Sequence, residues 1–474
     1  MKIFFKIFSM FTPRELGQCA GLFIVMVVGA MLEAIGIGAI LPLISVMGQS
    51  DFLHEHLLLS EYLSCFGIYT HTQFVMSLSL LLVILYLLKN FYLAWQLRLQ
   101  INFSITKQIQ FSKDLLATYL AKPYHFHLDH NTATLLRNVN NGGNAIFTYI
   151  LINTFQLLTE IITVATIWGM LICVDSFTAI IVAGAMGGLV YALIRTFRKR
   201  IEYAGDMKNN YAARYIQSVN QGLGGIKETK VMQKESFFLD DFVKNYEKYG
   251  LANQRFLFLN QLPRMIIESL VVSALLFLIV VKIAMGGNPM DIVPLLGVLA
   301  LAAFRLMPSA SRIVNTSNTI RFEMPLFEEL YDELMAIKER KLNHRKFDFD
   351  KVSSLLPFLY QIRVDHIGFH YPDVTEDVLF DVSFSVPKGS YVGIIGSSGA
   401  GKTTFVDILL GLLVPTRGKI FVDDVDVYQD VRAWQANIAY VPQSIYLIDA
   451  TIRENVALGE LMMYVSIKHL PWLS

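Results

Sequence analysis

Six stretches of this sequence are apolar and long enough to cross a lipid bilayer, and they restrict the fold more than any other feature. A span needs about 20 residues, and a segment in lipid must satisfy its own backbone hydrogen bonds, so each stretch is predicted to be a helix. Charged residues make up 17% of the chain, below the soluble average of about 25%, as expected for a membrane protein. The stretches cover approximately residues 17–46, 72–97, 146–173, 176–194, 258–281 and 291–313.

The connecting loops differ in charge, and this difference predicts the orientation. The loop after the first span contains Asp51, Glu55 and Glu61 but no lysine or arginine, whereas the loop after the fourth span opens with "RTFRKR". Basic loops stay on the cytosolic side. Both termini are therefore predicted to be cytosolic, with an uncleaved N-terminus. The loop after the second span is basic as well, and both basic loops are long and amphipathic. This predicts that the spans continue as helices and are interrupted by short elbows at "KPYHFHLDHN" and "NQGLGGIKETK".

The composition changes after the last span, which predicts a second domain. Residues 327–354 are rich in charge and look like a helix followed by a linker. Short runs typical of β-strands follow from residue 358: "QIRVDHIGFHYP", "VLFDVSFSVPKGS", "YVGIIG", "GKIFVDDVDV" and "NIAYVPQ". We predict a transmembrane domain over residues 1–325, a linker over 326–356 and a soluble α/β domain over 357–474. The net charge of +1 indicates no nucleic-acid partner. The three widely spaced cysteines predict neither a disulfide framework nor a zinc site.

The motif with the clearest chemistry lies in the soluble domain. The segment "GSSGAGKTT" fits the P-loop pattern G-x-x-x-x-G-K-[ST], between a predicted strand "YVGII" and a predicted helix "TTFVDILLGLL". Glycines let backbone N–H groups turn toward phosphate oxygens, the lysine reaches the β- and γ-phosphates, and the hydroxyl after it binds Mg²⁺. The helix N-terminus adds partial positive charge. The predicted nucleotide-binding residues are Gly396, Ser397, Ser398, Gly399, Ala400, Gly401, Lys402, Thr403 and Thr404.

Together, these spans and this P-loop resemble the ATP-binding cassette (ABC) exporter half-transporters. The resemblance covers nearly the whole chain. It implies a six-helix transmembrane domain followed by an α/β ATP-binding cassette, a homodimer, and ATP and Mg²⁺ as cofactors. It further implies that Tyr371 in "FHYP" stacks on adenine, and that Gln443 in "YVPQ" contacts Mg²⁺ and the attacking water. Thr403 and Gln443 are thus the expected Mg²⁺ ligands.

Within this family, three segments are similar to bacterial flippases for undecaprenyl-pyrophosphate-linked oligosaccharides. They are "LEAIGIGAILPLIS" in the first span, "GGIKETKVMQKE" in the second basic loop and "LAAFRLMPSASRIVNT" in the last span. The resemblance implies a protein of the bacterial inner membrane that translocates a lipid-linked glycan. An exporter of another substrate, such as a peptide or a drug, is the alternative.

Cationic residues within the spans are the candidate substrate residues. An arginine at the centre of a span costs at least about 2.5 kcal/mol, so intramembrane charges usually serve a function. Cations suit a pyrophosphate group, and this points to Arg305, Arg264 and Lys89. Glu33 and Glu160 are candidate counter-charges. Simpler roles remain open, because Arg264 is spaced to pair with Glu268 along the helix and Lys89 can extend to the membrane surface.

The cassette departs from the family pattern after residue 443. No LSGGQ signature, no Walker B carboxylates and no switch histidine follow. We reject the apolar-plus-Asp run at 420–424, because it lies too close to the P-loop helix and matches an earlier family strand, with Asp424 in place of a glycine. The resemblance is expected to end near residue 460, where "LMMYVSIKHLPWLS" begins, as after a frameshift or premature stop. A non-catalytic form that binds ATP without hydrolysing it is therefore a further alternative.

Overall fold

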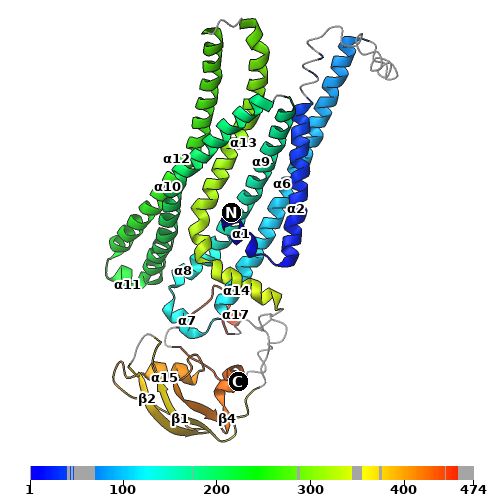
Figure 1. Ribbon diagram of the computed structural model, residues 1–474. Helices are drawn as coiled ribbons and strands as arrows, with labels where there is room; N and C mark the ends of the chain where they lie inside the picture. The colour runs from blue at the N-terminus through cyan, green and yellow to red at the C-terminus, as the bar shows by residue number, and fades with distance from the viewer. Residues whose placement is uncertain are drawn as a thin grey trace. The chain divides into compact units, whose positions relative to one another are not determined.

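The protein is described here by a computed structural model, which divides the chain into two compact units (Figure 1). One unit comprises residues 1–122 and 126–347, and the other comprises residues 123–125 and 348–474. The structure describes residues 2–39, 43, 46, 70–174, 176–284, 289–343, 355–372, 376–442 and 445–456.

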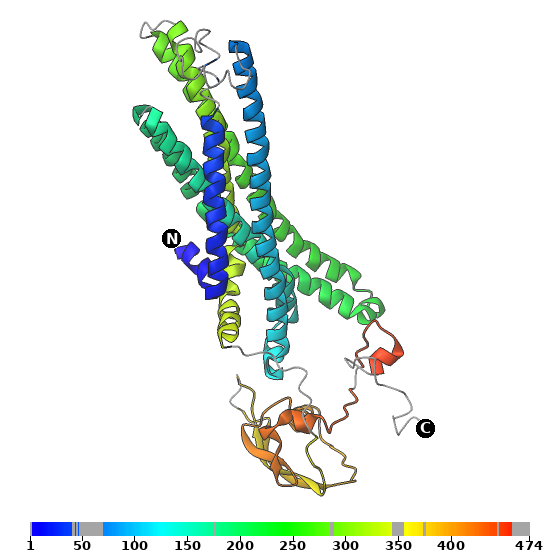
Figure 2. The same ribbon diagram turned by 90° about the vertical axis from the view of Figure 1, so that its right-hand side faces the viewer.

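The first unit is a bundle of long helices, seen from two directions in Figures 1 and 2. Helix α10 packs against α12 and α13, while α2 packs against α6 and α9. The longer helices are α2 (Pro13–Gly38), α6 (His71–Leu120), α9 (Ile152–Val174), α10 (Ser176–Gly224), α12 (Glu235–Ala284), α13 (Pro289–Glu329) and α14 (Tyr331–Leu342). The shorter ones are α1 (Lys2–Ser9), α7 (Tyr124–Asp129), α8 (Thr132–Arg137), the π-helical η1 (Asn138–Gly142) and η2 (Asn144–Leu151), and α11 (Ile226–Val231).

Four helical segments among the described residues are long and apolar enough to cross a membrane: Pro13–Gly36, His71–Leu120, Thr132–Gly169 and Glu235–Val281. They overlap the first, second, third and fifth predicted spans. The fourth and sixth predicted spans lie on α10 and α13, where many side chains fall outside the described set. The last seven residues of the first predicted span, 40–46, lie mostly outside the described residues.

Several helices are longer than a bilayer requires, as the amphipathic loops predicted. Helix α6 has 50 residues, α10 has 49 and α12 has 50. At 1.5 Å per residue, each is about 75 Å long, against roughly 30 Å of hydrocarbon. Short helices α7 and α11 occupy the two predicted elbows. The long amphipathic loops are therefore continuous helices with short interruptions, as expected.

The charged segment after the last predicted span, expected to be a helix followed by a linker, packs against the first unit over its helical part. Phe327 and Leu330 are fully buried, and Leu334 and Ile337 of α14 are 5% exposed. These side chains join one apolar core with residues of α1, α6 and η2. Lys341 also pairs with Asp114 of α6 at 2.9 Å. Apolar residues at helical spacing therefore bind residues 327–342 to the first unit, although the local composition is charged.

The second unit is built on a four-stranded antiparallel sheet of order β2-β1-β3-β4. Ile362 of the central strand pairs with Val386 on one side and Val422 on the other. Alternate residues of β1 and β3 enter a core with Phe405, Ile408 and Trp434. The strands are β1 (Gln361–Phe369), β2 (Leu379–Pro387), β3 (Arg417–Val422) and β4 (Val425–Asp426), and the helices are α15 (Lys402–Leu409), η3 (Val427–Gln429), α16 (Val431–Gln435) and α17 (Ile452–Val456).

Two predicted strands of the second unit are absent from its described residues. Residues 391–395, expected to precede the P-loop as a strand, form no ladder, and all five are exposed. Residues 437–442 are likewise not a strand. A strand requires a neighbour to take up its N–H and C=O groups, and no described segment pairs with either run. Apolar composition alone was therefore an insufficient basis for these two predictions.

Candidate nucleotide-binding site

The P-loop is shaped by two glycines in the left-handed backbone region. Gly399 has φ 83° and Gly401 has φ 78°, values that side chains disfavour. A Cβ on Gly401 would lie 2.9 Å from both the carbonyl oxygen of Val378 and Cδ2 of Leu379. Glycine is therefore required at position 401 for two reasons, the backbone angle and the close approach of the neighbouring chain. This conformation turns the chain directly into α15.

Lys402 holds its ammonium group over the loop. Its Nζ donates to the carbonyl oxygens of Gly396 at 2.8 Å and Ser397 at 2.6 Å. Lys402 is also the first residue of α15, whose first amides have no partner within the helix and carry partial positive charge. The loop thus gathers a side-chain cation and backbone donors at one point. Both groups suit an anion.

The two threonines after the lysine have different environments. Thr403 is exposed, while Thr404 is 7% exposed and its Oγ1 lies 3.2 Å from the hydroxyl oxygen of Tyr371. The Thr403 hydroxyl is accessible to a metal ion. The Thr404 side chain instead joins the helix to Tyr371, two residues after the end of β1. The nucleotide role predicted for Thr404 stays a prediction.

Tyr371, the predicted adenine-stacking residue, lies beside the P-loop helix. Its ring packs edge-on to Phe369 with centroids 5.0 Å apart, and the side chain is half-buried. The structure thus brings Tyr371 next to residues 402–404, which are 31 or more positions away in sequence. Gln443 lies outside the described residues. Stacking by Tyr371 and the Mg²⁺ contact of Gln443 stay predictions.

Two side chains that the sequence analysis missed hold the far end of α15. The Tyr428 hydroxyl donates to the carbonyl oxygens of Ile408 at 2.7 Å and Leu413 at 3.0 Å, and Trp434 Nε1 donates to that of Leu409 at 2.7 Å. Burial raises the pKa of Tyr428, so the hydroxyl stays protonated and able to donate. Such capping satisfies carbonyls that the helix leaves free. No local sequence pattern predicts this capping, because Tyr428 and Trp434 lie 15 to 25 residues after the carbonyls that they bind.

Asp423, in the run that we rejected as a Walker B motif, has a structural role. Its carboxylate accepts N–H bonds from Leu359, Tyr360 and Gln361 at 2.8 to 2.9 Å. These backbone donors, first that of Gln361, hold the pKa of Asp423 below its usual value. A carboxylate occupied by three amides closes the β3–β4 turn against the start of β1. This role accounts for the aspartate without a metal.

The charged residues predicted for the membrane domain have different environments. Lys89 is 7% exposed, and its Nζ lies 4.4 Å from the centre of the Tyr86 ring. Arg264 is exposed. Arg305 lies on α13, and its side chain is outside the described residues. Glu160 pairs with Arg312, 3.0 Å away, and Glu33 accepts from Thr163 at 3.4 Å.

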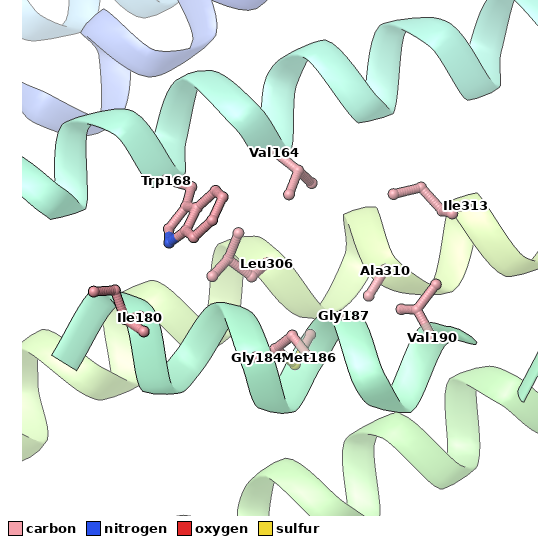
Figure 3. A pocket seen from close by; sticks show the side chains of 10 residues that line it. All are labelled: Val164, Trp168, Ile180, Gly184, Met186, Gly187, Val190, Leu306, Ala310 and Ile313. Carbon is pink, nitrogen blue, oxygen red and sulfur yellow. The ribbon is translucent and has the colours of Figure 1, made fainter. Parts of the chain in front are cut away.

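An apolar pocket lies close to the Glu160–Arg312 pair. It has a volume of about 490 Å³ and opens between α9, α10 and α13 (Figure 3). Trp168, Leu306 and Ile313 project into it, and Gly184 and Gly187 form part of its wall. A Cβ on either glycine would meet nothing within 4 Å. The pocket therefore offers hydrocarbon walls within the bundle of long helices.

Comparisons with known proteins agree with these features. Residues 379–471 match the family model described as "ABC transporter", which reaches past residue 460, where we expected the resemblance to end. The chain is 25% identical over 320 residues to the ATP-dependent lipid A-core flippase of Bordetella avium (strain 197N), covering 64% of this chain and 50% of the relative. It is 24% identical over 351 residues to the Beta-(1→2)glucan export ATP-binding/permease protein of Brucella suis biovar 1 (strain 1330), covering 72% and 56%.

The fold comparison covers both units. A solved structure described as a bacterial Atm1-family ABC exporter with ATP bound matches 90% of this chain and 73% of its own, with a TM-score of 0.64 at 19% identity. The fold is therefore that of an ABC exporter: a domain of long apolar helices followed by a small sheet-containing domain. The chain spans about half the length of the curated relatives that it matches.

Proposed function

We propose that residues 396–404 bind the phosphates of ATP. The observation that carries this proposal is the joint placement of three groups: the left-handed Gly399 and Gly401, the Lys402 ammonium over the loop and the first turn of α15. Phosphate binding would transfer the Lys402 ammonium from the carbonyls of Gly396 and Ser397 to the phosphate oxygens, which carry more negative charge. Tyr371 supplies an aromatic surface beside the same helix.

Mg²⁺ fits this site as a companion of the nucleotide. Mg²⁺ usually keeps several waters and binds through one or two protein oxygens plus substrate phosphates. The exposed Thr403 hydroxyl is one such oxygen, and Gln443 is the second proposed ligand. When bound, the ion would neutralise phosphate charge. Hydrolysis additionally needs a group that orients water and groups that stabilise the γ-phosphate, and residues 1–474 contain neither a Walker B carboxylate nor an LSGGQ segment.

The substrate is proposed to be a lipid-linked oligosaccharide or related glycolipid, translocated across the inner membrane by a homodimer with cytosolic termini and ATP-binding domains. One cited relative is named a lipid A-core flippase and the other a glucan export protein. The apolar pocket suits a hydrocarbon tail, and cationic residues within the spans suit a pyrophosphate. An exporter of an apolar drug or peptide is the second candidate, and the nearly uniform hydrocarbon lining of the same pocket favours it.

Nucleotide binding is tested by photolabelling the purified 474-residue chain with azido-ATP in detergent. Lys402→Ala should lose most of the labelling, because the phosphate loses its cationic partner. Lys388→Ala is the matched control, since Lys388 is an exposed lysine of the same unit whose Nζ donates to the carbonyl oxygen of Phe358. Equal labelling of all three proteins would contradict the proposal.

Substrate class is tested in a chimera in which the complete cassette of the lipid A-core flippase replaces residues 357–474. In vesicles, Arg305→Ala should reduce translocation of a fluorescent lipid-linked glycan and leave basal ATP hydrolysis largely unchanged. Lys199→Ala, an exposed cation of α10, is the control. Translocation of apolar dyes but not of the glycan would favour the second candidate.

A further inference from the structure

A second cavity lies in the first unit, away from the apolar pocket and on different residues. It has a volume of about 210 Å³ and lies between the π-helical segment, α10, α12 and α13. At about 30 Å³ for each water-sized volume, it has room for a molecule of on the order of five to ten non-hydrogen atoms. Its lining differs from that of the first pocket, because lysine, arginine, asparagine and tyrosine side chains reach it.

Arg137 forms a fixed cationic wall of this cavity. The residue is 3% exposed, and its guanidinium donates twice to Asn138 Oδ1, at 2.7 and 3.1 Å, and once to the carbonyl oxygen of Asn209, at 3.1 Å. A fourth bond goes to Glu329. A guanidinium has five N–H groups, so one on Nη1 remains for a ligand. The orientation of this donor is set before any ligand arrives.

Lys208 supplies a second cation from α10. Its Nζ lies 2.5 Å from Glu323 Oε1 and 4.8 Å from the centre of the Phe322 ring. Phe322 is itself held by stacking on Phe256, with centroids 3.9 Å apart. An ammonium has three N–H groups, and the bond to Glu323 uses one. Two donors of Lys208 are therefore left.

Each cation on the cavity wall has a carboxylate partner. Arg137 pairs with Glu329, which lies outside the lining, and Lys208 pairs with Glu323, which belongs to it. Both cations nevertheless keep the N–H groups that these pairs do not use. Asn141 and Asn144 add neutral hydrogen-bonding groups from η1 and η2. π-Helical turns are uncommon and often mark functional sites.

We propose that this cavity binds a small oxyanion, a molecule carrying a phosphate or carboxylate group. The Arg137 and Lys208 donors would bind the anionic group, and the asparagine amides would take its remaining acceptors. Such a ligand would join α8, α10 and α13, since each contributes a charged residue. This site goes beyond the proposed transport function, and it uses neither the P-loop nor the residues proposed for the glycolipid.

Calorimetric titration with inorganic phosphate and, separately, with glutarate tests the proposal. The Lys402→Ala background minimises binding at the P-loop, and any residual binding there is common to all variants. Lys208→Gln should weaken binding by roughly tenfold or more, the worth of one charge-assisted hydrogen bond. Lys199→Gln, an exposed lysine on the same helix, should not. Ala212→Leu fills the cavity, leaves both cations in place and should also abolish binding.

The two anions separate the possible ligands. Binding of phosphate alone assigns a phosphate group, and binding of glutarate alone assigns a carboxylate. Circular dichroism melting shows which variants fold. If Lys208→Gln does not fold, the binding result for Ala212→Leu decides the outcome. Absence of binding by both anions, or equal dissociation constants for Lys208→Gln and Lys199→Gln, would overturn the proposal and leave the ion pairs as structural contacts between helices.

Discussion

Arg312 and Glu160 form an ion pair between α13 and α9, with Nη1 and Oε1 3.0 Å apart. Glu160 is 6% exposed, whereas the Arg312 side chain is 44% exposed. From the sequence we expected Glu160 to serve as a counter-charge, but the cations that we named were Arg305, Arg264 and Lys89. The pair lies one helical turn from the apolar pocket, since Val164 of α9 and Ile313 of α13 line it. The pocket thus has a charged boundary at one end.

Removing the buried member of this pair should destabilise the helical unit. Glu160→Ala leaves Arg312 without its partner, and breaking a buried pair costs about 3–5 kcal/mol. Because Arg312 is partly exposed, we expect a smaller loss of about 1–3 kcal/mol. Thermal or denaturant unfolding in detergent measures it. Arg198→Ala, which breaks an exposed pair with Glu202, should cost less than about 1 kcal/mol, and similar losses for the two variants would contradict this reasoning.

A side chain at Gly401 should abolish nucleotide binding. Gly401→Ala places a Cβ 2.9 Å from the Val378 carbonyl oxygen at φ 78°, so the loop must move. We expect strong loss of azido-ATP labelling and a stability cost of about 1–3 kcal/mol. Gly393→Ala is the matched control in the preceding segment, where a Cβ would meet nothing within 4 Å. Normal labelling of Gly401→Ala would show that this conformation is not needed.

The stabilising contribution of Asp423 to the second unit should be lost in acid. Its folded pKa is lowered by the amides of Gln361, Leu359 and Tyr360, so the contribution is fully present above the unfolded value of about 3.9. It is lost as pH falls through the lower folded value. The difference in melting temperature between the natural chain and Asp423→Asn should therefore be largest near neutral pH and shrink below about pH 4. Asp424→Asn, at the exposed neighbouring position, is the control.

A polypeptide of these 474 residues should bind ATP without turning it over. Lys402 and the loop amides provide binding, but in-line attack also needs an oriented water and stabilised γ-phosphate charge. Phosphate release in nanodiscs should equal that of Lys402→Ala. A rate on the order of 1 per second above that blank, typical of transport ATPases, would show that residues 1–474 supply the missing groups in another way.

The proposed homodimer should bring the second elbow of one subunit to the ATP-binding domain of the other. A cysteine at the exposed position Lys227 of α11, labelled with a photoreactive maleimide in a cysteine-free background, should yield a cross-linked species of twice the mass. The label at position Lys199 is the comparison. If both positions yield cross-links only within single chains, the result would count against contact between the elbow of one subunit and the ATP-binding domain of the other.

Much of this protein is determined by the local character of its sequence. Apolar runs of about 20 residues must be helical in lipid, whatever surrounds them, so the four long apolar helices among the described residues agree with the spans read from the sequence. The P-loop is equally local, because its glycines, its lysine and the first residues of the following helix all lie within nine residues. Strands β1, β2 and β3 lie in short β-like runs that were predicted from the sequence, whereas their antiparallel pairing was not.

Tertiary structure decided what depends on partners distant in sequence. Residues 391–395 have strand composition, yet a strand exists only when another strand accepts its hydrogen bonds. Residues 327–342 belong to a charged segment that we expected to be a helix followed by a linker, and their apolar stripe packs against α1, α6 and η2. The pairing of Glu160 with Arg312, and the meeting of Arg137 with Lys208 at one cavity, join residues 71 to 152 positions apart. Such contacts follow from helix packing, which no short segment encodes.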